Sequence, residues 1–135
     1  MEKQPLKTRP AHKKINGSLS TLLRAFDLPI LIEKLKSTPT WTQGELNAMV
    51  LMKSPAKQIV LTALHAGTEI KSFQSSDSVT FQIIEGRVYF HTQRGSVILD
   101  TGQMLLFQEK TKYSLTTAED TVLLLTIAKS TSKRN

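Results

Sequence analysis

The stretch GTEIKSFQSSDSVTFQIIEG, which runs from Gly67 to Gly86, decides the predicted fold. Apolar and polar residues alternate over residues 78–83, and this period of two indicates a β-strand with one apolar face. The alternation resumes over residues 88–92. Because glycine takes a positive φ angle without steric cost, Glu85-Gly86 is typical of a two-residue hairpin loop between the two strands.

A two-residue loop fixes how the flanking strands pair. It predicts that Ile83 lies opposite Val88 and that Phe81 lies opposite Phe90, so that the apolar residues of both strands share one face. The same register turns His91 to the other face, away from the core. The two-residue loop and the alternation therefore predict the same apolar face, which is packed against a core.

Residue spacing in two places resembles that of the cupin family. The first motif of that family has a glycine, five residues, His-x-His, a short gap, a glutamate, six residues and a second glycine, and Gly67 and Gly86 stand at this spacing. The second motif has Pro-x-Gly, an apolar strand and a histidine. It resembles Asp100-Thr101-Gly102, the apolar residues that follow, and Tyr113-Ser114-Leu115.

The resemblance covers about residues 57–128, and residues 35–51 are similar to the lead-in of small single-domain cupins. It implies an all-β fold, namely a cupin-type (RmlC-like) jelly-roll β-barrel with one or two short N-terminal helices. It also implies a homodimer, because cupin relatives often pair through sheet edges and swapped N-terminal segments. Exposed edge strands need cover in any case, and the N-terminal helices are the candidate cover.

The chain departs from the family pattern at the positions that usually bind a metal. The two histidines of the first motif fall on Phe73 and Ser75, the glutamate falls on Val79, and the histidine of the second motif falls on Tyr113. A transition-metal site needs several imidazole, carboxylate or thiolate groups that converge on one point. We therefore expect the barrel without the metal, and no cofactor.

These substitutions make the predicted barrel interior more apolar. An apolar cavity with a few polar groups is the usual form of a small-molecule site, but the same side chains could instead fill a small barrel completely. The residues of the predicted ligand pocket are Phe73, Ser75, Val79, Phe81, Phe90 and Tyr113.

The preferred interpretation is a metal-free binding or sensing module for a small, partly apolar ligand, with no catalytic residue assigned. One alternative is a metal-independent enzyme of the isomerase or lyase type, with Tyr113 or His65 as proton donor. Such a role for Tyr113 requires a lowered pKa. The other alternative is a filled barrel that acts as a structural or interaction protein.

Length and composition narrow the class of protein. At 135 residues the chain is expected to form one domain. The absence of cysteine excludes disulfides and thiolate chemistry, and favours a reducing compartment. No stretch approaches the ~20 apolar residues needed to span a bilayer. The charged N-terminus lacks the apolar segment of a signal peptide, so a cytoplasmic location is expected.

The net charge of +7 suggests at first an anionic partner such as nucleic acid. However, many of the cations lie near the two ends of the chain, and without them the body is close to neutral. No nucleic-acid motif or pair of stacking aromatic residues is present, so a nucleic-acid partner is not favoured. The terminal cations are Lys3, Lys7, Arg9, Lys13, Lys14, Lys129, Lys133 and Arg134.

The N-terminal part of the chain predicts short helices. Apolar residues recur at helical spacing over residues 19–26. Asp27 is a plausible N-cap for a second helix, with Pro29 in its first turn, and this helix should stop before Pro39. Trp41 is expected on a loop, as a packing anchor.

Turn signals divide the rest of the chain into short strands, as in an all-β barrel. Polar residues 108–112 are expected to form a loop at the barrel mouth. The predicted segments are a flexible basic tail (1–18), a helical lead-in (19–56), the barrel (57–128) and a flexible C-terminal tail (129–135). The predicted strands are residues 46–52, 57–64, 79–83, 88–92, 96–99, 103–107, 113–115 and 122–128.

Overall fold

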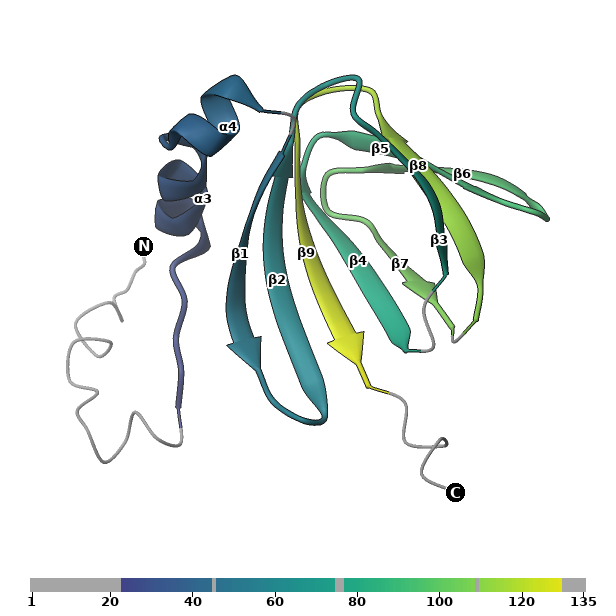
Figure 1. Cartoon of the computed structure of the whole chain (residues 1–135), viewed down its shortest axis with the longest axis horizontal. Coiled ribbons are helices and arrows are strands. Elements are labelled where there is room, and N and C mark those ends of the chain that lie inside the picture. Colours follow the sequence, from purple (N-terminus) through teal and green to yellow (C-terminus); the bar gives the residue numbers. More distant parts are fainter. Residues whose placement is uncertain (1–22, 45, 75–76, 109, 130–135) are drawn as a thin grey trace, which may run out of the picture. The chain divides into compact units, whose positions relative to one another are not determined.

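The computed structural model describes residues 23–44, 46–74, 77–108 and 110–129. The described residues fall into two compact units that divide between Leu31 and Ile32. The described part of the second unit contains nine strands in two antiparallel sheets (Figure 1). This arrangement is an all-β jelly roll, and it confirms the predicted fold class. No helix among the described residues has the length and apolar character needed to cross a bilayer.

The larger sheet has five strands in the order β1-β2-β9-β4-β7. Its strands begin and end close to where the alternation of the sequence predicts them, and the break between the first two falls at Ser54-Pro55-Ala56, as expected. The strands are β1 (Leu46–Lys53), β2 (Lys57–Leu64), β4 (Ser78–Glu85), β7 (Met104–Phe107) and β9 (Thr121–Ala128).

The smaller sheet has four strands in the order β3-β8-β5-β6, so β6 is one of its edges. Strand β5 lies at the centre of this sheet, between β6 and β8. Strand β3 was not among the strands predicted from the sequence. The strands are β3 (Glu69–Gln74), β5 (Arg87–Thr92), β6 (Gly95–Asp100) and β8 (Lys112–Thr117).

Both sheets contribute alternate residues to one core. On β4, Val79, Phe81 and Ile83 are buried, whereas the residues between them are partly or fully exposed, as the period of two predicts. Strand β5 buries Val88 and Phe90 in the same way. The remaining buried members of this core are Leu64, Leu99, Phe107, Tyr113, Leu115 and Leu123.

The predicted hairpin between β4 and β5 is wrong, because the two strands belong to different sheets. Gly86 has a φ angle of +99°, but a Cβ atom there would lie 2.5 Å from the backbone oxygen of Asp120 and from Thr121 Oγ1. The glycine therefore lets the chain pass against the β8–β9 turn as it changes sheet. Phe81 and Phe90 still meet, as facing residues of the two layers, with ring centroids 4.9 Å apart.

Helix α3 (Leu28–Lys36) has the predicted N-cap. Asp27 Oδ1 accepts a hydrogen bond from the backbone N–H of Ile30 at 3.3 Å, which satisfies one of the unpaired donors of the first turn. The helix ends before Pro39, as expected. Of the helix predicted over residues 19–26, only residues 23–26 are described, and these are not helical.

A second helix, α4 (Pro39–Gln43), contains Trp41, so the prediction of a loop at this residue is wrong. Proline has no N–H to leave unpaired and is well suited to the first turn, and Pro39 therefore begins a new helix as well as following the end of α3. Thr38 caps α4, since its Oγ1 accepts a hydrogen bond from the N–H of Trp41 at 3.4 Å.

Trp41 is the packing anchor that the sequence predicts, with 7% of its surface exposed. Its ring stacks on His65 at the end of β2, with centroids 3.5 Å apart. Nearby, Asn47 Nδ2 donates hydrogen bonds to Leu35 O at 3.1 Å and to Thr38 Oγ1 at 2.9 Å. These contacts attach the segment that begins at Ile32 to the first two strands.

Candidate functional site

Four aromatic rings form a connected cluster inside the barrel. Phe107 and Tyr113 are stacked, with centroids 4.1 Å apart. The centroid of Phe81 lies 4.9 Å from that of Phe90, 5.8 Å from that of Phe107 and 5.6 Å from that of Tyr113. Phe90 and Phe107 are 5.7 Å apart. Offset and edge-on contacts at these distances are the preferred geometries of aromatic pairs, so the cluster is a packed core.

The structure brings four of the six predicted pocket residues into this core: Val79, Phe81, Phe90 and Tyr113. Each belongs to one contiguous group of buried side chains from both sheets. The backbone of Phe73 pairs with that of Tyr113 across β3 and β8. Ser75 lies outside the described residues.

Two of the positions at which the resemblance would place metal ligands, Val79 and Tyr113, lie in the described core. Val79 has no donor atom in its side chain and is buried, and the ring of Tyr113 is stacked on Phe107. In the described parts of the chain, no group of three histidine, aspartate or glutamate residues lies close enough to hold an ion. Such a site needs several converging donors of these types.

The pKa of Tyr113 is shifted in the direction opposite to the one that the proton-donor hypothesis needs. Burial raises the pKa of its phenol above the ordinary value, because desolvation disfavours the phenolate. The proton-donor hypothesis needs the opposite shift. The phenol therefore stays protonated and packs as part of the core.

His65, the other residue considered as a proton donor, is engaged in structural contacts. Its Nε2 lies 2.6 Å from the backbone oxygen of Trp41, and the carbonyl can only accept, so Nε2 carries the hydrogen. Its Nδ1 lies 3.8 Å from Asp120 Oδ1. The imidazole thus joins α4 to the β8–β9 turn.

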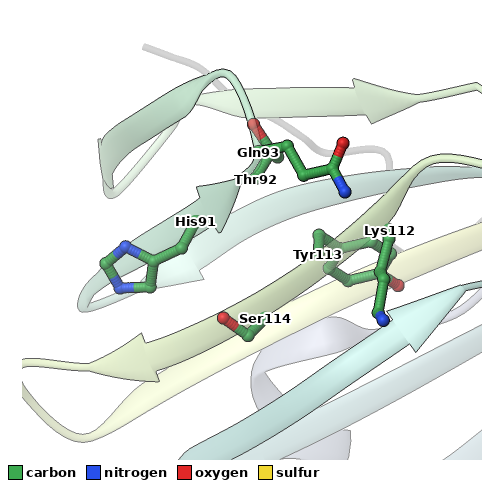
Figure 2. A pocket seen from close by; sticks show the side chains of 6 residues that line it. All are labelled: His91, Thr92, Gln93, Lys112, Tyr113 and Ser114. Carbon is green, nitrogen blue, oxygen red and sulfur yellow. The ribbon is translucent and has the colours of Figure 1, made fainter.

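A hollow of about 310 Å³ lies where β5 ends and β8 begins (Figure 2). The two strands pair here, His91 opposite Ser114 and Thr92 opposite Tyr113. His91 is half-buried and points away from the core, as the sequence predicts, and its Nδ1 lies 2.9 Å from Ser96 Oγ. The lining residues are His91, Thr92, Gln93, Lys112, Tyr113 and Ser114.

A second hollow, of about 450 Å³, shares Thr92, Gln93 and Lys112 with the first. Its other lining residues are Arg94, Lys110 and Thr111. Because the two hollows share three residues, we treat them as one site and call it the strand-end hollow. It is bounded by the β5–β6 turn and by the loop between β7 and β8.

Sequence reasoning located both of these loops but not the site between them. The polar loop at residues 108–112 was predicted, and the predicted strands 88–92 and 96–99 leave the β5–β6 turn between them. What joins them is the pairing of β5 with β8, two strands that are separated by β6 and β7 in the sequence. No local pattern carries that information. Of the four predicted pocket residues whose side chains the structure describes, Tyr113 is the one that also lines the hollow.

No protein-family profile matches the chain, and no curated protein matches it either.

Solved structures, in contrast, resemble it clearly. A cupin superfamily protein from Desulfitobacterium hafniense matches with a TM-score of 0.62 and 13% identity, over 96% of this chain and 94% of that protein. An RmlC-like cupin from Desulfovibrio desulfuricans matches with a TM-score of 0.63 and 18% identity, over 78% of this chain and 96% of the other.

An enzyme is also among the similar structures. A salicylate 1,2-dioxygenase from Pseudoaminobacter salicylatoxidans matches with a TM-score of 0.68 and 17% identity. The match covers 82% of this chain but only 38% of the dioxygenase. At these identities the comparisons establish the fold. The described barrel of this chain has the cupin fold. It shares that fold with a dioxygenase and with proteins whose names give no activity.

Proposed function

We propose that this chain uses its cupin fold as a metal-independent binding module for a small, partly apolar ligand, which it takes at the strand-end hollow. The observation that carries the proposal is the aromatic cluster. One of its rings, Tyr113, stands at a position where the family resemblance would place a metal ligand, and Val79, at another such position, is buried in the same core. A ligand therefore has more room beside Tyr113, at the end of the strands, than among the rings.

The composition of the hollow supports this choice. The imidazole of His91 lines the hollow, and the neighbouring residues offer hydroxyl, amide and ammonium groups. A concave surface that combines apolar area with a few polar groups is the usual form of a small-molecule site. The hollow has a volume of about 310 Å³, which is enough for a ligand of about the size of one aromatic ring.

The test is to fill the hollow and measure the loss of binding. Full-length protein is titrated with a panel of small aromatic compounds, and binding is followed by NMR of backbone amides. Ser114→Phe places a ring in the hollow and should weaken any observed binding at least about tenfold. Thr116→Phe is the matched control, since Thr116 is another half-buried residue of β8 and does not line the hollow.

If neither variant changes the affinity of a compound, that compound binds elsewhere, and the result contradicts the placement of the site. Binding lost equally in both variants would point to a general disturbance of β8, and would contradict it as well.

A second candidate function, self-association, is favoured by a different observation. Strands β6 and β7 each form the edge of a sheet, and they expose apolar side chains, with Ile98 59% and Leu106 58% exposed. Edge strands with exposed apolar residues are prone to pair with another chain. We propose a homodimer through these edges.

Sedimentation across a concentration series tests this second candidate. Ile98→Lys or Leu106→Lys should shift the protein toward monomer. Val50→Lys on β1 changes a residue of similar exposure on another edge strand and should not. A monomer at all concentrations in the unmodified protein would overturn the homodimer.

A further inference from the structure

The strand-end hollow is rich in positive charge. Arg94 lies on the β5–β6 turn, and Lys110 and Lys112 lie on and just after the loop between β7 and β8. Among the residues that the structure describes, Arg94 and Lys112 form no ion pair. In the sequence of these two loops, residues 93–94 and 108–111, the acidic residue is Glu109. It lies outside the described residues.

The hollow also supplies uncharged hydrogen-bonding groups. Thr92, Gln93 and Thr111 line the same space as the three cations. On the turn, Thr92 Oγ1 donates to the backbone oxygen of Gly95 at 3.1 Å and accepts from the N–H of Arg94 at 3.2 Å. These hydrogen bonds fix the conformation of the turn and the backbone position of Arg94.

The opposite loop is closed in a similar way. The N–H of Thr111 donates to the backbone oxygen of Gln108 at 3.3 Å. Lys110 adopts a φ angle of +66°, which residues other than glycine rarely take. Cations are therefore held on two separate loops that face one hollow, and not along one strand.

We propose that this part of the hollow binds the phosphoryl group of a small phosphorylated ligand. This inference rests on the proposed function and names the polar end of its ligand. Arginine offers a planar fork of donors that matches phosphate oxygens, and lysine adds compact positive charge. Arg94 and Lys112, beside the hydroxyl groups of Thr92 and Thr111, suit an anion with more than one negative charge.

The size of the site fits the same ligand class. The cationic part has a volume of about 450 Å³, and it shares Thr92, Gln93 and Lys112 with the part that contains His91 and Tyr113. One molecule could place its phosphoryl group among the cations and its apolar body against His91. Nucleic acid is not favoured, because strand-binding sites present exposed aromatic faces for stacking bases, whereas Tyr113 is buried.

Phenyl phosphate is the probe, because it combines a phosphoryl group with an apolar ring. Titration into the ¹⁵N-labelled full chain should shift the amide signals of residues 92–94 and 110–112. Arg94→Gln and Lys112→Gln should each weaken binding about tenfold, as expected for the loss of one charge-assisted contact. Lys53→Gln removes a charge from β1, at the opposite edge of the larger sheet from β7, and should change affinity less than about twofold.

Two simpler probes separate this inference from the proposed function. Inorganic phosphate alone should shift the amides of the two loops, and phenol alone should shift those of His91 and Ser114. If phosphate binds and phenol does not, and phenyl phosphate is no tighter than phosphate, the anion site stands and the partly apolar ligand is wrong. If phenol binds but neither phosphate compound moves the loop amides, the anion site is wrong.

The inference is also overturned if Arg94→Gln and Lys112→Gln bind phenyl phosphate as tightly as Lys53→Gln does. A further contradictory result concerns nucleic acid. If single-stranded DNA binds through the same residues and phenyl phosphate does not displace it, the cations serve a polymer and not a small ligand. Dispersed amide spectra of each variant show that loss of binding is not loss of fold.

Discussion

Phe81 lies at the centre of the aromatic cluster, and its ring contacts three others that come from β5, β7 and β8. It is 2% exposed. A buried side chain stabilises the fold because its own surface is removed from water and because its neighbours pack against it. If the ring is removed, the neighbours cannot fill the space that it leaves. The same residue therefore reports whether the barrel is filled or open.

Phe81→Ala should lower the free energy of unfolding by roughly 3–5 kcal/mol, because a void replaces the ring. Chemical denaturation measures the loss. Val50→Ala is the control, since Val50 is exposed on β1, and it should cost less than about 0.5 kcal/mol. A loss below about 1.5 kcal/mol for Phe81→Ala would indicate that the ring already borders open space, against the packed core.

Tyr113 links stability to pH. Burial raises its pKa in the folded chain, so the folded state holds the phenolic proton more tightly than the unfolded state does. The stabilisation is present in full below the ordinary tyrosine pKa of about 10 and is lost as the pH rises through the folded pKa.

Unfolding free energies measured between about pH 9 and 11.5 test this linkage. They should fall less steeply with pH for Tyr113→Phe than for the unmodified protein. Tyr89→Phe on the outer side of β5 serves as the comparison for other titrating groups. Parallel pH profiles for the unmodified chain and Tyr113→Phe would mean that the phenol is not buried in solution.

At the scale of elements, the connection from β4 to β5 determines the architecture. Gly86 combines a positive φ angle with close approach to Asp120 and Thr121, whereas Gly102 has a φ angle of +88° and open space around it. Substitution of Gly102 therefore tests the free-energy cost of the backbone conformation alone, and substitution of Gly86 tests that cost together with steric conflict.

Gly102→Ala should destabilise the fold by about 1 kcal/mol through its backbone conformation alone. Gly86→Ala adds a clash with backbone atoms and should cost at least about 3 kcal/mol. Thermal or denaturant unfolding of the two variants provides the comparison. Equal losses would show that the sheet change does not depend on close packing at Gly86.

The same connection explains what the sequence can and cannot predict. The strands follow from alternation, so β2 and most of β4 and β5 were predicted within a residue or two. Pairing depends on distant segments: β4 lies between β7 and β9, and Glu85-Gly86 has the residues of a hairpin loop without forming one. Inward-facing residues were nevertheless predicted correctly, because facing sheets and a hairpin both bury Phe81 against Phe90.

The candidate site also has a part that the sequence predicts and a part that it does not. Alternation indicated that Phe81 and Phe90 point into the barrel, the family resemblance indicated the same for Tyr113, and all three belong to the core. The strand-end hollow could not be predicted, because it depends on the pairing of β5 with β8 and on the meeting of two loops. Trp41 was assigned its packing role but the wrong element, since a proline can begin a helix as readily as it ends one.

For the whole molecule, the central question is how a cupin fold can act when the positions at which the family resemblance would place metal ligands carry Phe73, Ser75, Val79 and Tyr113. The buried core at Val79 and Tyr113 leaves no donor set there. The proposed answer places recognition at one end of the strands, on polar and cationic side chains, while the interior serves only to hold the two sheets together.

Elemental analysis of the full chain tests this most directly. The protein is produced in medium supplemented with iron, manganese, nickel and zinc, dialysed, and measured for metal per chain. We expect far less than one transition-metal atom per chain, because no set of imidazole, carboxylate or thiolate donors converges in the described barrel. About one atom of a single metal per chain, retained through dialysis, would contradict a barrel that works without an ion.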